Sequence, residues 1–252
     1  MSVFSDYSIY YDLLYKDKDY KKESEYVLNA LSNTGNGLRS LLELGCGTGK
    51  HAELFLKNFN RYVGVDLSED MVNQGKDRLK GKNAELHLGD VRKFQINEKF
   101  DAAVSLFHVA SYQTENNDFF SYLVTANSHL EKGSVFLFDF WYGPAVLNLK
   151  PSVKIKRMSN DKYAVTRLAE PSSDSNKNLV VVNYEVLIED KQNGNYSKIE
   201  ESHPMRYFFI PEIQYFLEKS GFDLDSTRFE EWITGAEPSE NSWGVTCITR
   251  KK

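Results

Sequence analysis

From residue 38 onward, short apolar runs alternate with amphipathic stretches along the chain. The apolar runs predict buried strands, and they lie at residues 38–44, 62–66, 84–88, 100–107 and 135–140. The stretches between them predict helices, which cover residues 51–59, 68–81 and 119–130. Strands that alternate with helices in this way build a parallel, doubly wound sheet with helices on both faces. The pattern therefore predicts an α/β fold.

The pattern changes after Pro151. Strand-like segments at 153–158, 163–168, 179–188 and 207–210 are separated by the polar turns P-S-S-D-S-N and K-Q-N-G-N. Turns of this composition join antiparallel strands, so we predict an antiparallel β insertion over residues 151–210. The α/β pattern resumes with a helix at 211–220 and strands at 223–232 and 243–249. Residues 1–150 and 211–252 then form the main domain, with a mostly parallel seven-stranded sheet.

The first predicted strand ends in a glycine-rich turn, E-L-G-C-G-T-G-K, which spans Glu43 to Lys50. A phosphate-binding P-loop needs four residues between its first glycine and the Gly-Lys pair, whereas three residues separate Gly45 from Gly49. A dinucleotide fingerprint needs the spacing G-x-G-x-x-G, which the turn also lacks. The spacing therefore argues against a phosphate or pyrophosphate as the ligand of this turn.

Three acidic residues accompany the turn in a fixed order. Glu43 precedes it, Asp66 ends the second predicted strand, and Asp90 follows the third. An acid about 20 residues beyond a glycine turn, at the end of the second strand, binds ribose hydroxyls. Glycines without Cβ also allow a ligand to approach the backbone closely. Together these features resemble the class I S-adenosylmethionine-dependent methyltransferases, whose cofactor is a nucleoside joined to an amino acid without phosphate.

That resemblance implies a Rossmann-like methyltransferase fold and S-adenosylmethionine as the cofactor, with S-adenosylhomocysteine as its product. It places the glycines along the methionine part, Asp66 on the ribose, Met71 on the adenine ring and Asp90 at the adenine amine. The cofactor-binding residues expected on this basis are Tyr11, Lys18, Gly45, Cys46, Gly47, Gly49, Asp66, Leu67, Met71, Asp90, Val91 and Leu106.

Further motifs resemble one subgroup, the N,N-dimethyltransferases of nucleotide-linked amino sugars. They are Y-D-L-L-Y with K-D-Y at 11–20, L-S-E-D-M at 67–71, G-D-V-R-K-F at 89–94, F-D-A-A-V at 100–104 and F-W-Y at 140–142. The resemblance covers nearly the whole chain, including the antiparallel insertion. It implies that Tyr11 and Lys18 close over the cofactor, that Lys18 pairs with its carboxylate, and that the acceptor is a small molecule, a nucleotide-linked amino sugar.

Acceptor-side groups are expected beyond the carboxyl ends of the fourth and fifth strands, where such sheets bind ligands. We predict His108 and Tyr112 as catalytic groups, and Asp139, Trp141, Tyr142, Arg206 and Trp243 as substrate-binding groups. The subgroup usually has glutamate where Asp139 stands, and it has Ser-Gly-Arg where this chain has the segment 241–244. An O-methyltransferase of a sugar or other small molecule therefore remains an alternative. A nicotinamide-dependent oxidoreductase is a second one.

Composition and charge limit the classes of binding partner that we expect for this protein. The formal net charge of −5 disfavours a nucleic-acid surface, which needs basic stripes. The apolar runs are far shorter than the roughly 20 residues of a membrane helix, and Cys46 and Cys247 are the only cysteines. The sequence contains no recognisable metal-ligand motif, so we expect no metal. We expect a cytoplasmic enzyme, monomeric or homodimeric, that binds neither nucleic acid nor membrane.

Overall fold

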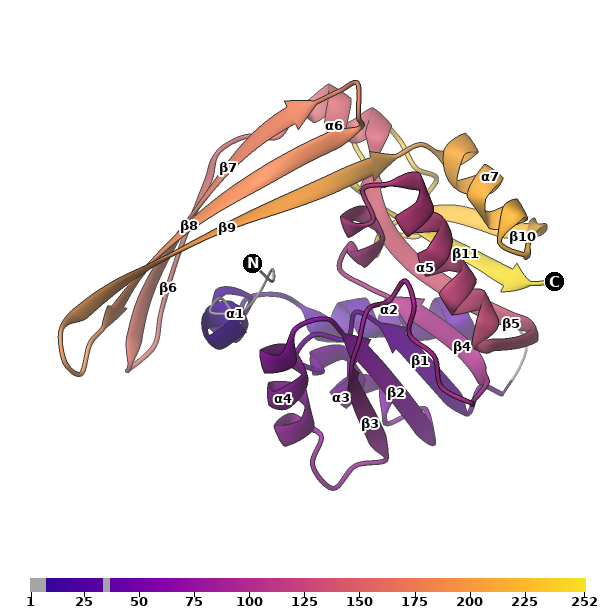
Figure 1. Cartoon of the computed structure of the whole chain (residues 1–252), viewed down its shortest axis with the longest axis horizontal. Coiled ribbons are helices and arrows are strands. Elements are labelled where there is room, and N and C mark those ends of the chain that lie inside the picture. The colour runs from indigo at the N-terminus through magenta and orange to yellow at the C-terminus, as the bar shows by residue number, and fades with distance from the viewer. Residues whose placement is uncertain (1–7, 34–36) are drawn as a thin grey trace.

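The computed structural model describes residues 8–33 and 37–252. Its central sheet has seven strands in the order β3-β2-β1-β4-β5-β11-β10. Strands β1 to β5 are parallel to one another, and β11 runs antiparallel to both of its neighbours, β5 and β10. These strands are β1 Ser40–Leu44, β2 Arg61–Asp66, β3 Ala84–Leu88, β4 Phe100–Ser105, β5 Leu130–Tyr142, β10 Phe222–Glu231 and β11 Gly244–Lys251. The predicted seven-stranded α/β sheet is confirmed (Figure 1).

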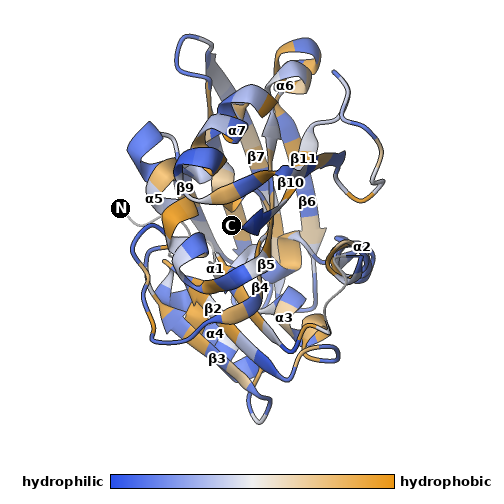
Figure 2. Ribbon diagram, turned by 90° about the vertical axis from the view of Figure 1, so that its right-hand side faces the viewer, coloured by the Kyte–Doolittle hydropathy of each residue, from blue (hydrophilic) through white to orange (hydrophobic). Residues whose placement is uncertain are grey.

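Helices cover both faces of this sheet, which explains the near-continuous apolar strands. One face packs against α2 Tyr20–Ser32, α3 Lys50–Phe55 and α4 Glu69–Arg78. The other packs against α5 Asn116–Ser128 and α7 Ile210–Lys219. Neighbouring residues of one strand therefore enter different cores, as Leu41 and Leu42 do in β1. Figure 2 shows the hydrophobic colour gathered on the central strands.

The insertion is a long antiparallel ribbon that projects from the core (Figure 1). Its strands are β6 Lys154–Ser159, β7 Tyr163–Asp174, β8 Leu179–Asp190 and β9 Asn195–Phe208. The ribbon joins the central sheet at one point, because Trp141 and Tyr142 of β5 pair in parallel with Tyr207 and Phe208 of β9. The short helix α6 Gly143–Leu149 leads from β5 into the ribbon. This junction fixes the position of β9 relative to the ends of the central strands.

The ribbon strands are longer than we predicted. Residues 171–174, expected in a turn, continue β7, and β9 begins at Asn195 rather than near Tyr207. The cause is exposure: much of the outer ribbon faces solvent on both sides, so polar residues occupy strand positions without a buried face to mark them. Within the core, β5 begins at Leu130, which we predicted as the last residue of a helix at 119–130, and α5 ends at Ser128.

Two N-terminal helices were not predicted as elements. The first, α1 Ser8–Leu14, lies between the ribbon and the core (Figure 1). It packs on Val165 and Val186 of the ribbon in a small apolar cluster. Asp12 of α1 forms ion pairs with Arg78 of α4 and Lys50 of α3. The helix therefore joins three separate parts of the molecule at the edge of the site described below.

No helix in the part of the chain that the structure describes is both long and apolar enough to cross a membrane.

Candidate functional site

A cavity of about 310 Å³ opens where the carboxyl ends of β1, β2 and β4 meet. Its volume lies near the lower end of the roughly 300–1,000 Å³ that small-molecule pockets occupy. Part of its wall comes from the loops after these strands, part from α1 and the segment that follows it, and part from Pro204 of β9. The cavity therefore brings together segments that are far apart in the sequence, and it lies where open α/β sheets bind their ligands.

The glycine turn forms the floor beside β1. Gly45 and Gly47 have φ angles of 83° and 52°, in the left-handed region that favours glycine. A Cβ at Gly45 would also collide with the side chain of Val109. The Gly45 and Cys46 amides both donate to Val65 O, at 2.8 and 3.0 Å, which ties the turn to the end of β2. The turn thus presents bare backbone to the cavity.

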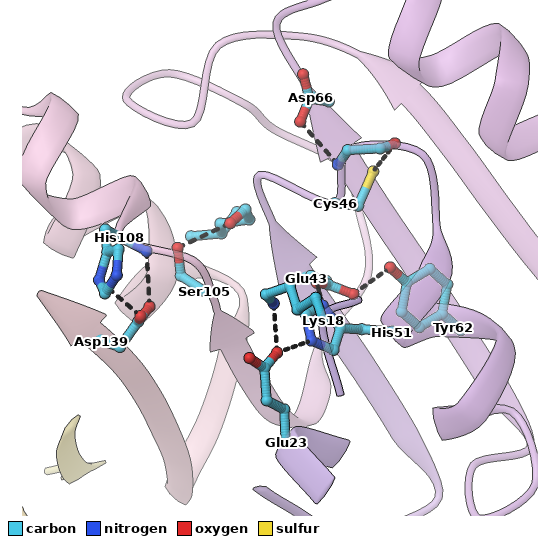
Figure 3. A network of polar contacts seen from close by, with 12 residues as sticks. Lys18, Glu23, Glu43, Cys46, His51, Tyr62, Asp66, Ser105, His108 and Asp139 are labelled. Atoms are coloured by element: carbon cyan, nitrogen blue, oxygen red, sulfur yellow. Dashed lines mark hydrogen bonds and ion pairs between the residues drawn. The ribbon is translucent and has the colours of Figure 1, made fainter. Parts of the chain in front are cut away.

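Asp66, at the end of β2, faces this turn. Its Oδ2 accepts from Gly47 N at 2.8 Å (Figure 3), and its Oδ1 accepts from Ser68 N at 2.9 Å. A carboxylate offers about four lone-pair sites, so both oxygens keep the capacity to accept from a pair of hydroxyls in the cavity. Burial raises the pKa of Asp66, although the two backbone amides oppose this shift. The backbone therefore holds the carboxylate in a fixed orientation.

Glu43 lies deeper, at the cavity wall, and its side chain is 1% exposed. Its Oε2 accepts from the Tyr62 hydroxyl at 2.5 Å (Figure 3). Burial raises the pKa of Glu43 to about 8, even though the Tyr62 hydrogen bond opposes the shift. The nearby Asp66 carboxylate raises it further. A cationic group in the cavity would relieve this repulsion.

Lys18 belongs to a buried polar chain on the other side of Glu43. Its ammonium pairs with Glu23 and lies 4.3 Å from the centre of the Phe107 ring. Glu23 also accepts from His51 Nε2 at 2.8 Å (Figure 3). Burial would raise the pKa of Glu23, but His51 and Lys18 outweigh it, and the pKa is lowered. The α2 helix thus places a carboxylate that orients the Lys18 ammonium at the cavity wall.

Asp90, after β3, is held by Arg92. The carboxylate accepts from the Arg92 backbone amide at 2.9 Å and from the guanidinium at 2.7–3.1 Å. This contact lowers the pKa of Asp90. Arg92 also pairs with Asp118 of α5 at 2.8 Å. The neighbouring Met71 and Val91 are buried and line the cavity, so this end combines apolar walls with a charged rim.

A strained turn follows β4. Phe107 and His108 have φ angles of 67° and 65°, and non-glycine residues pay a cost for this conformation. Asp139 of β5, 1% exposed, stabilises the turn. Its Oδ1 accepts from His108 N at 2.9 Å, and its Oδ2 lies 2.8 Å from His108 Nδ1 (Figure 3). The turn places Phe107 and Val109 in the cavity wall.

Tyr112 belongs to the 3₁₀ turn Val109–Tyr112, which follows the strained residues. Its ring lines the cavity. Its hydroxyl lies 2.8 Å from Nδ1 of His203, a residue of β9 that is 1% exposed. The ribbon therefore supplies a buried hydrogen-bonding partner for a side chain of the cavity.

The structure brings most predicted cofactor residues together. All but Gly49 line the cavity, and the ones that do are Tyr11, Lys18, Gly45, Cys46, Gly47, Asp66, Leu67, Met71, Asp90, Val91 and Leu106. Gly49 is instead the N-cap of α3, with a φ of 72°. Of the two predicted catalytic groups, Tyr112 lines the cavity, whereas His108 lies behind Phe107 against Asp139. The roles of these residues remain predictions.

The five predicted substrate-binding residues do not line the cavity. Asp139 holds the strained turn, and Trp141 and Trp243 pack against each other, 5.5 Å apart, in an apolar cluster with the ribbon. Tyr142 packs on the main core. Arg206 is 7% exposed and binds Glu212, Asn116 and Thr114 O. Their assignment to the acceptor remains a prediction, for which this geometry offers no direct support.

Sequence reasoning missed several lining residues. They are Tyr20, Glu43, Thr48, Lys50, His51, Ser68, Arg92, Phe107, Val109, Gln113 and Pro204. Lys50 and Arg92 adjoin predicted residues inside quoted motifs, so their position along the chain could have indicated them. Pro204 gave no signal, because only the ribbon junction brings it to the cavity.

Comparisons with known proteins agree with this geometry. The profile of a methyltransferase domain family matches residues 41–133. The dTDP-3-amino-3,4,6-trideoxy-alpha-D-glucopyranose N,N-dimethyltransferase of Streptomyces venezuelae is 30% identical over 196 residues, which cover 77% of this chain and 81% of that protein. The dTDP-3-amino-3,6-dideoxy-alpha-D-glucopyranose N,N-dimethyltransferase of Streptomyces fradiae is 27% identical over 201 residues, 79% of this chain and 76% of that one.

A solved structure has the same fold. The sugar N-methyltransferase KedS8 from Streptoalloteichus aligns with a TM-score of 0.82 and 21% identity, over 100% of this chain and 97% of its own. The fold and the cavity define a Rossmann-like methyltransferase. The chain belongs to the family of S-adenosylmethionine-dependent methyltransferases that contains the nucleotide-linked amino-sugar N,N-dimethyltransferases, and its methyl donor is S-adenosylmethionine.

Proposed function

We propose that this enzyme methylates the amine of a nucleotide-linked amino sugar. The observation that carries the proposal is the composition of the cavity wall, which runs from the glycine turn and Asp66 to Tyr112 and Pro204. One compartment thus combines groups suited to a nucleoside with a polar side chain suited to an acceptor. Two similar proteins are named as N,N-dimethyltransferases of dTDP-linked amino sugars, which supports an acceptor of the same class.

The donor set fits S-adenosylmethionine. The cofactor is cationic at its sulfonium and amino groups, and the cavity wall contains the acidic side chains of Asp66 and Asp90 together with the protonated Glu43. Asp66 would accept from the ribose hydroxyls, and the buried Met71 would pack on the adenine. Lys18, oriented by Glu23, would pair with the cofactor carboxylate, as charge-assisted hydrogen bonds are among the stronger polar contacts. When bound, the sulfonium supplies an electrophilic methyl group.

The other tasks of the protein are to align the methyl donor with the acceptor amine and to exclude water from the cavity. Methyl transfer is an in-line displacement, and correct positioning alone supplies a large part of such rate enhancements. Phe107, Val109 and Tyr11 provide an apolar wall around the reacting centre. An amine brings its own lone pair, so the protein needs only a weak base to receive the proton that the methylated nitrogen loses. Tyr112 is our candidate for this base, because it lines the cavity beside Val109.

Mass spectrometry tests the proposal with paired acceptors. The enzyme is incubated with S-adenosylmethionine and either a dTDP-linked aminodeoxy sugar or its hydroxy counterpart. We expect two successive mass increments of one methylene each on the amino sugar and none on the hydroxy sugar. A single increment on the hydroxy sugar alone would contradict the proposal and favour the O-methyltransferase. An Asp66→Ala variant serves as the negative control for cofactor-dependent transfer.

A further inference from the structure

A chain of three hydrogen-bonded side chains leads from the cavity into the ribbon. Tyr112 lines the cavity, and its hydroxyl lies 2.8 Å from His203 Nδ1. His203 Nε2 lies 3.0 Å from Glu201 Oε2. Glu201 and His203 are two residues apart on β9, so they lie on the same face of that strand. The chain thus connects the methyl-transfer compartment to a buried imidazole and a carboxylate behind it.

For a neutral His203 imidazole, the contacts fix the direction of these hydrogen bonds. An ionised carboxylate only accepts, so the proton of His203 lies on Nε2 and points at Glu201. Nδ1 is then the acceptor, and it receives the Tyr112 hydroxyl proton. With its proton directed at His203, the Tyr112 oxygen can only accept from a group in the cavity. An amine that carries N–H donors is complementary to such an oxygen.

The surroundings keep the imidazole in place. His203 pairs with Val182 of β8, and the Tyr184 ring of β8 lies edge-on to it, 4.7 Å away. Burial raises the pKa of Tyr184 to about 12, so this phenol stays neutral. The Arg167 guanidinium of β7 lies over the Tyr184 ring, 5.0 Å from its centroid. The ionisable groups around His203 thus include Tyr112, Tyr184 and Glu201, with the Arg167 guanidinium on the Tyr184 ring.

We propose that Glu201 and His203 are positioning residues that make Tyr112 the proton acceptor for the substrate amine. The inference rests on the proposed function. After methyl transfer the acceptor nitrogen carries one proton too many. Its N–H bond breaks as an O–H bond forms at Tyr112, while the original Tyr112 proton moves to His203 Nδ1. His203 becomes an imidazolium paired with the Glu201 carboxylate, and the product leaves as a neutral amine. The proton count balances when the imidazolium then releases this proton to solvent, which restores the neutral imidazole for the next methyl transfer.

The proposal also gives the ribbon a role. β9 is fixed to β5 at Tyr207 and Phe208, only a few residues beyond His203. Pro204, next to His203, is itself part of the cavity wall. The insertion thus contributes Pro204 to the cavity wall and the hydrogen-bonded pair of His203 and Glu201 behind Tyr112.

The test compares four variants of the full chain with the wild type. Tyr112→Phe removes the accepting oxygen, His203→Asn keeps a hydrogen-bond acceptor near Tyr112 but cannot take a proton, and Glu201→Gln removes the charge behind the imidazole. His129→Gln is the matched control, because His129 is also buried, at 2% exposed, and hydrogen-bonded, but lies outside the cavity wall. Measurements are kcat against pH with an amino-sugar acceptor, S-adenosylhomocysteine affinity, and ¹⁵N NMR of the histidines.

We expect Tyr112→Phe and His203→Asn to lower kcat by roughly 100-fold, the lower end of the range for proton-transfer groups. Their S-adenosylhomocysteine affinity should stay within about twofold, since the chain touches the acceptor side. The dependence of kcat on pH should change in His203→Asn and stay as in the wild type in His129→Gln. In the wild type, NMR should find His203 protonated on Nε2 and unprotonated on Nδ1 at neutral pH.

Three results would overturn the inference, and they are distinguishable. A wild-type His203 protonated on Nδ1 contradicts the proton arrangement directly, whether or not the variants fold. Wild-type kcat and an unchanged pH profile in His203→Asn contradict the proton transfer while leaving the proposed function intact. A wild-type enzyme that methylates no amine overturns the proposed function, and the inference fails with it.

Discussion

The two sides of the cavity are built in opposite ways. The side suited to the cofactor comes mostly from one continuous part of the chain, from Glu43 to Arg92, which lies at the ends of β1, β2 and β3 and in the segments that follow them. The side suited to the acceptor is assembled from the turn at 107–113 and from Pro204. Local sequence determines the cofactor side. The acceptor side is complete only when the ribbon pairs with β5, because this pairing brings Pro204 to the cavity. A fixed cofactor site thus adjoins a wall that a ribbon of different sequence could change.

The titratable groups of the cofactor side and the acceptor side also differ in their arrangement. On the cofactor side, burial raises the pKa values of Glu43 and Asp66, so the buried wall favours the uncharged form of these two acids. On the acceptor side, Tyr112, His203 and Glu201 form a single hydrogen-bonded chain that ends in one carboxylate. Changes on the first side should therefore act on cofactor affinity, and changes on the second should act on turnover or on stability.

The largest expected effect is on the cofactor side. Asp66→Ala removes the acceptor of two ribose hydroxyls, and hydrogen bonds to charged groups contribute about 1.5–3 kcal/mol each. We expect S-adenosylhomocysteine to bind at least about 100-fold more weakly in isothermal titration calorimetry. Asp70→Ala, an exposed aspartate of α4, is the matched control. Unchanged affinity in Asp66→Ala would remove Asp66 from the site.

The next effect concerns stability and pH. Folded Glu43 keeps its proton up to about pH 8, whereas an unfolded glutamate loses it near pH 4.3. Between these values the unfolded chain binds fewer protons, so the free energy of unfolding falls as pH rises, by up to roughly 1.4 kcal/mol per pH unit. Glu43→Gln should lack this fall and be more stable than the wild type at pH 8 by roughly 1–3 kcal/mol.

Urea denaturation at pH 5 and pH 8 measures this difference. The exposed Glu69→Gln is the control, because it carries the same chemical change on the first turn of α4. Equal pH dependence in the wild type and Glu43→Gln would show that Glu43 does not retain its proton in the folded enzyme.

A smaller effect distinguishes the two ends of the cofactor. Lys18→Met removes the ammonium that we assign to the cofactor carboxylate, and we expect about tenfold weaker S-adenosylhomocysteine binding. Binding of 5′-methylthioadenosine, which lacks that carboxylate, should stay unchanged in the same calorimetric titration. The exposed Lys21→Met controls for the loss of one positive charge nearby. Equal weakening of both ligands would mean that Lys18 acts on the shape of the cavity.

The smallest effect lies on the acceptor side. Trp243 packs on Trp141 in the apolar cluster between β5, β11 and the ribbon. Trp243→Phe should lower the free energy of unfolding by about 1–2 kcal/mol, since a smaller ring fills less of that cluster. The acceptor KM should remain within about twofold. A large rise in KM at unchanged stability would instead support the original prediction that Trp243 binds substrate.

The sheet was predictable because its strands are buried on both faces and therefore stand out as apolar runs. The turn at Gly45 and the acid at Asp66 were predictable for a related reason, as their spacing follows from the strand ends. The ribbon was only partly predictable. β9 carries polar residues such as Glu200 and Ser202 on exposed positions, so its length left no hydrophobic pattern to read.

The acceptor side was the least predictable part of the site. Aromatic residues near the end of β5, such as Trp141, lie at the expected position along the chain, but their side chains pack against the ribbon instead of lining the cavity. His203 gave no local signal at all, because its partner Tyr112 lies 91 positions earlier and meets it only through the pairing of β9 with β5. Long-range contacts of this kind depend on topology, which spacing within a motif does not encode.

The most direct test of the account is a crystal structure of the enzyme with S-adenosylhomocysteine and a dTDP-linked amino sugar. We predict that the ribose hydroxyls of the cofactor product lie on Asp66 and that the sugar amine lies within hydrogen-bond distance of the Tyr112 oxygen, in the same cavity. An amine bound away from Tyr112, or a nucleoside that does not touch Asp66, would contradict the account.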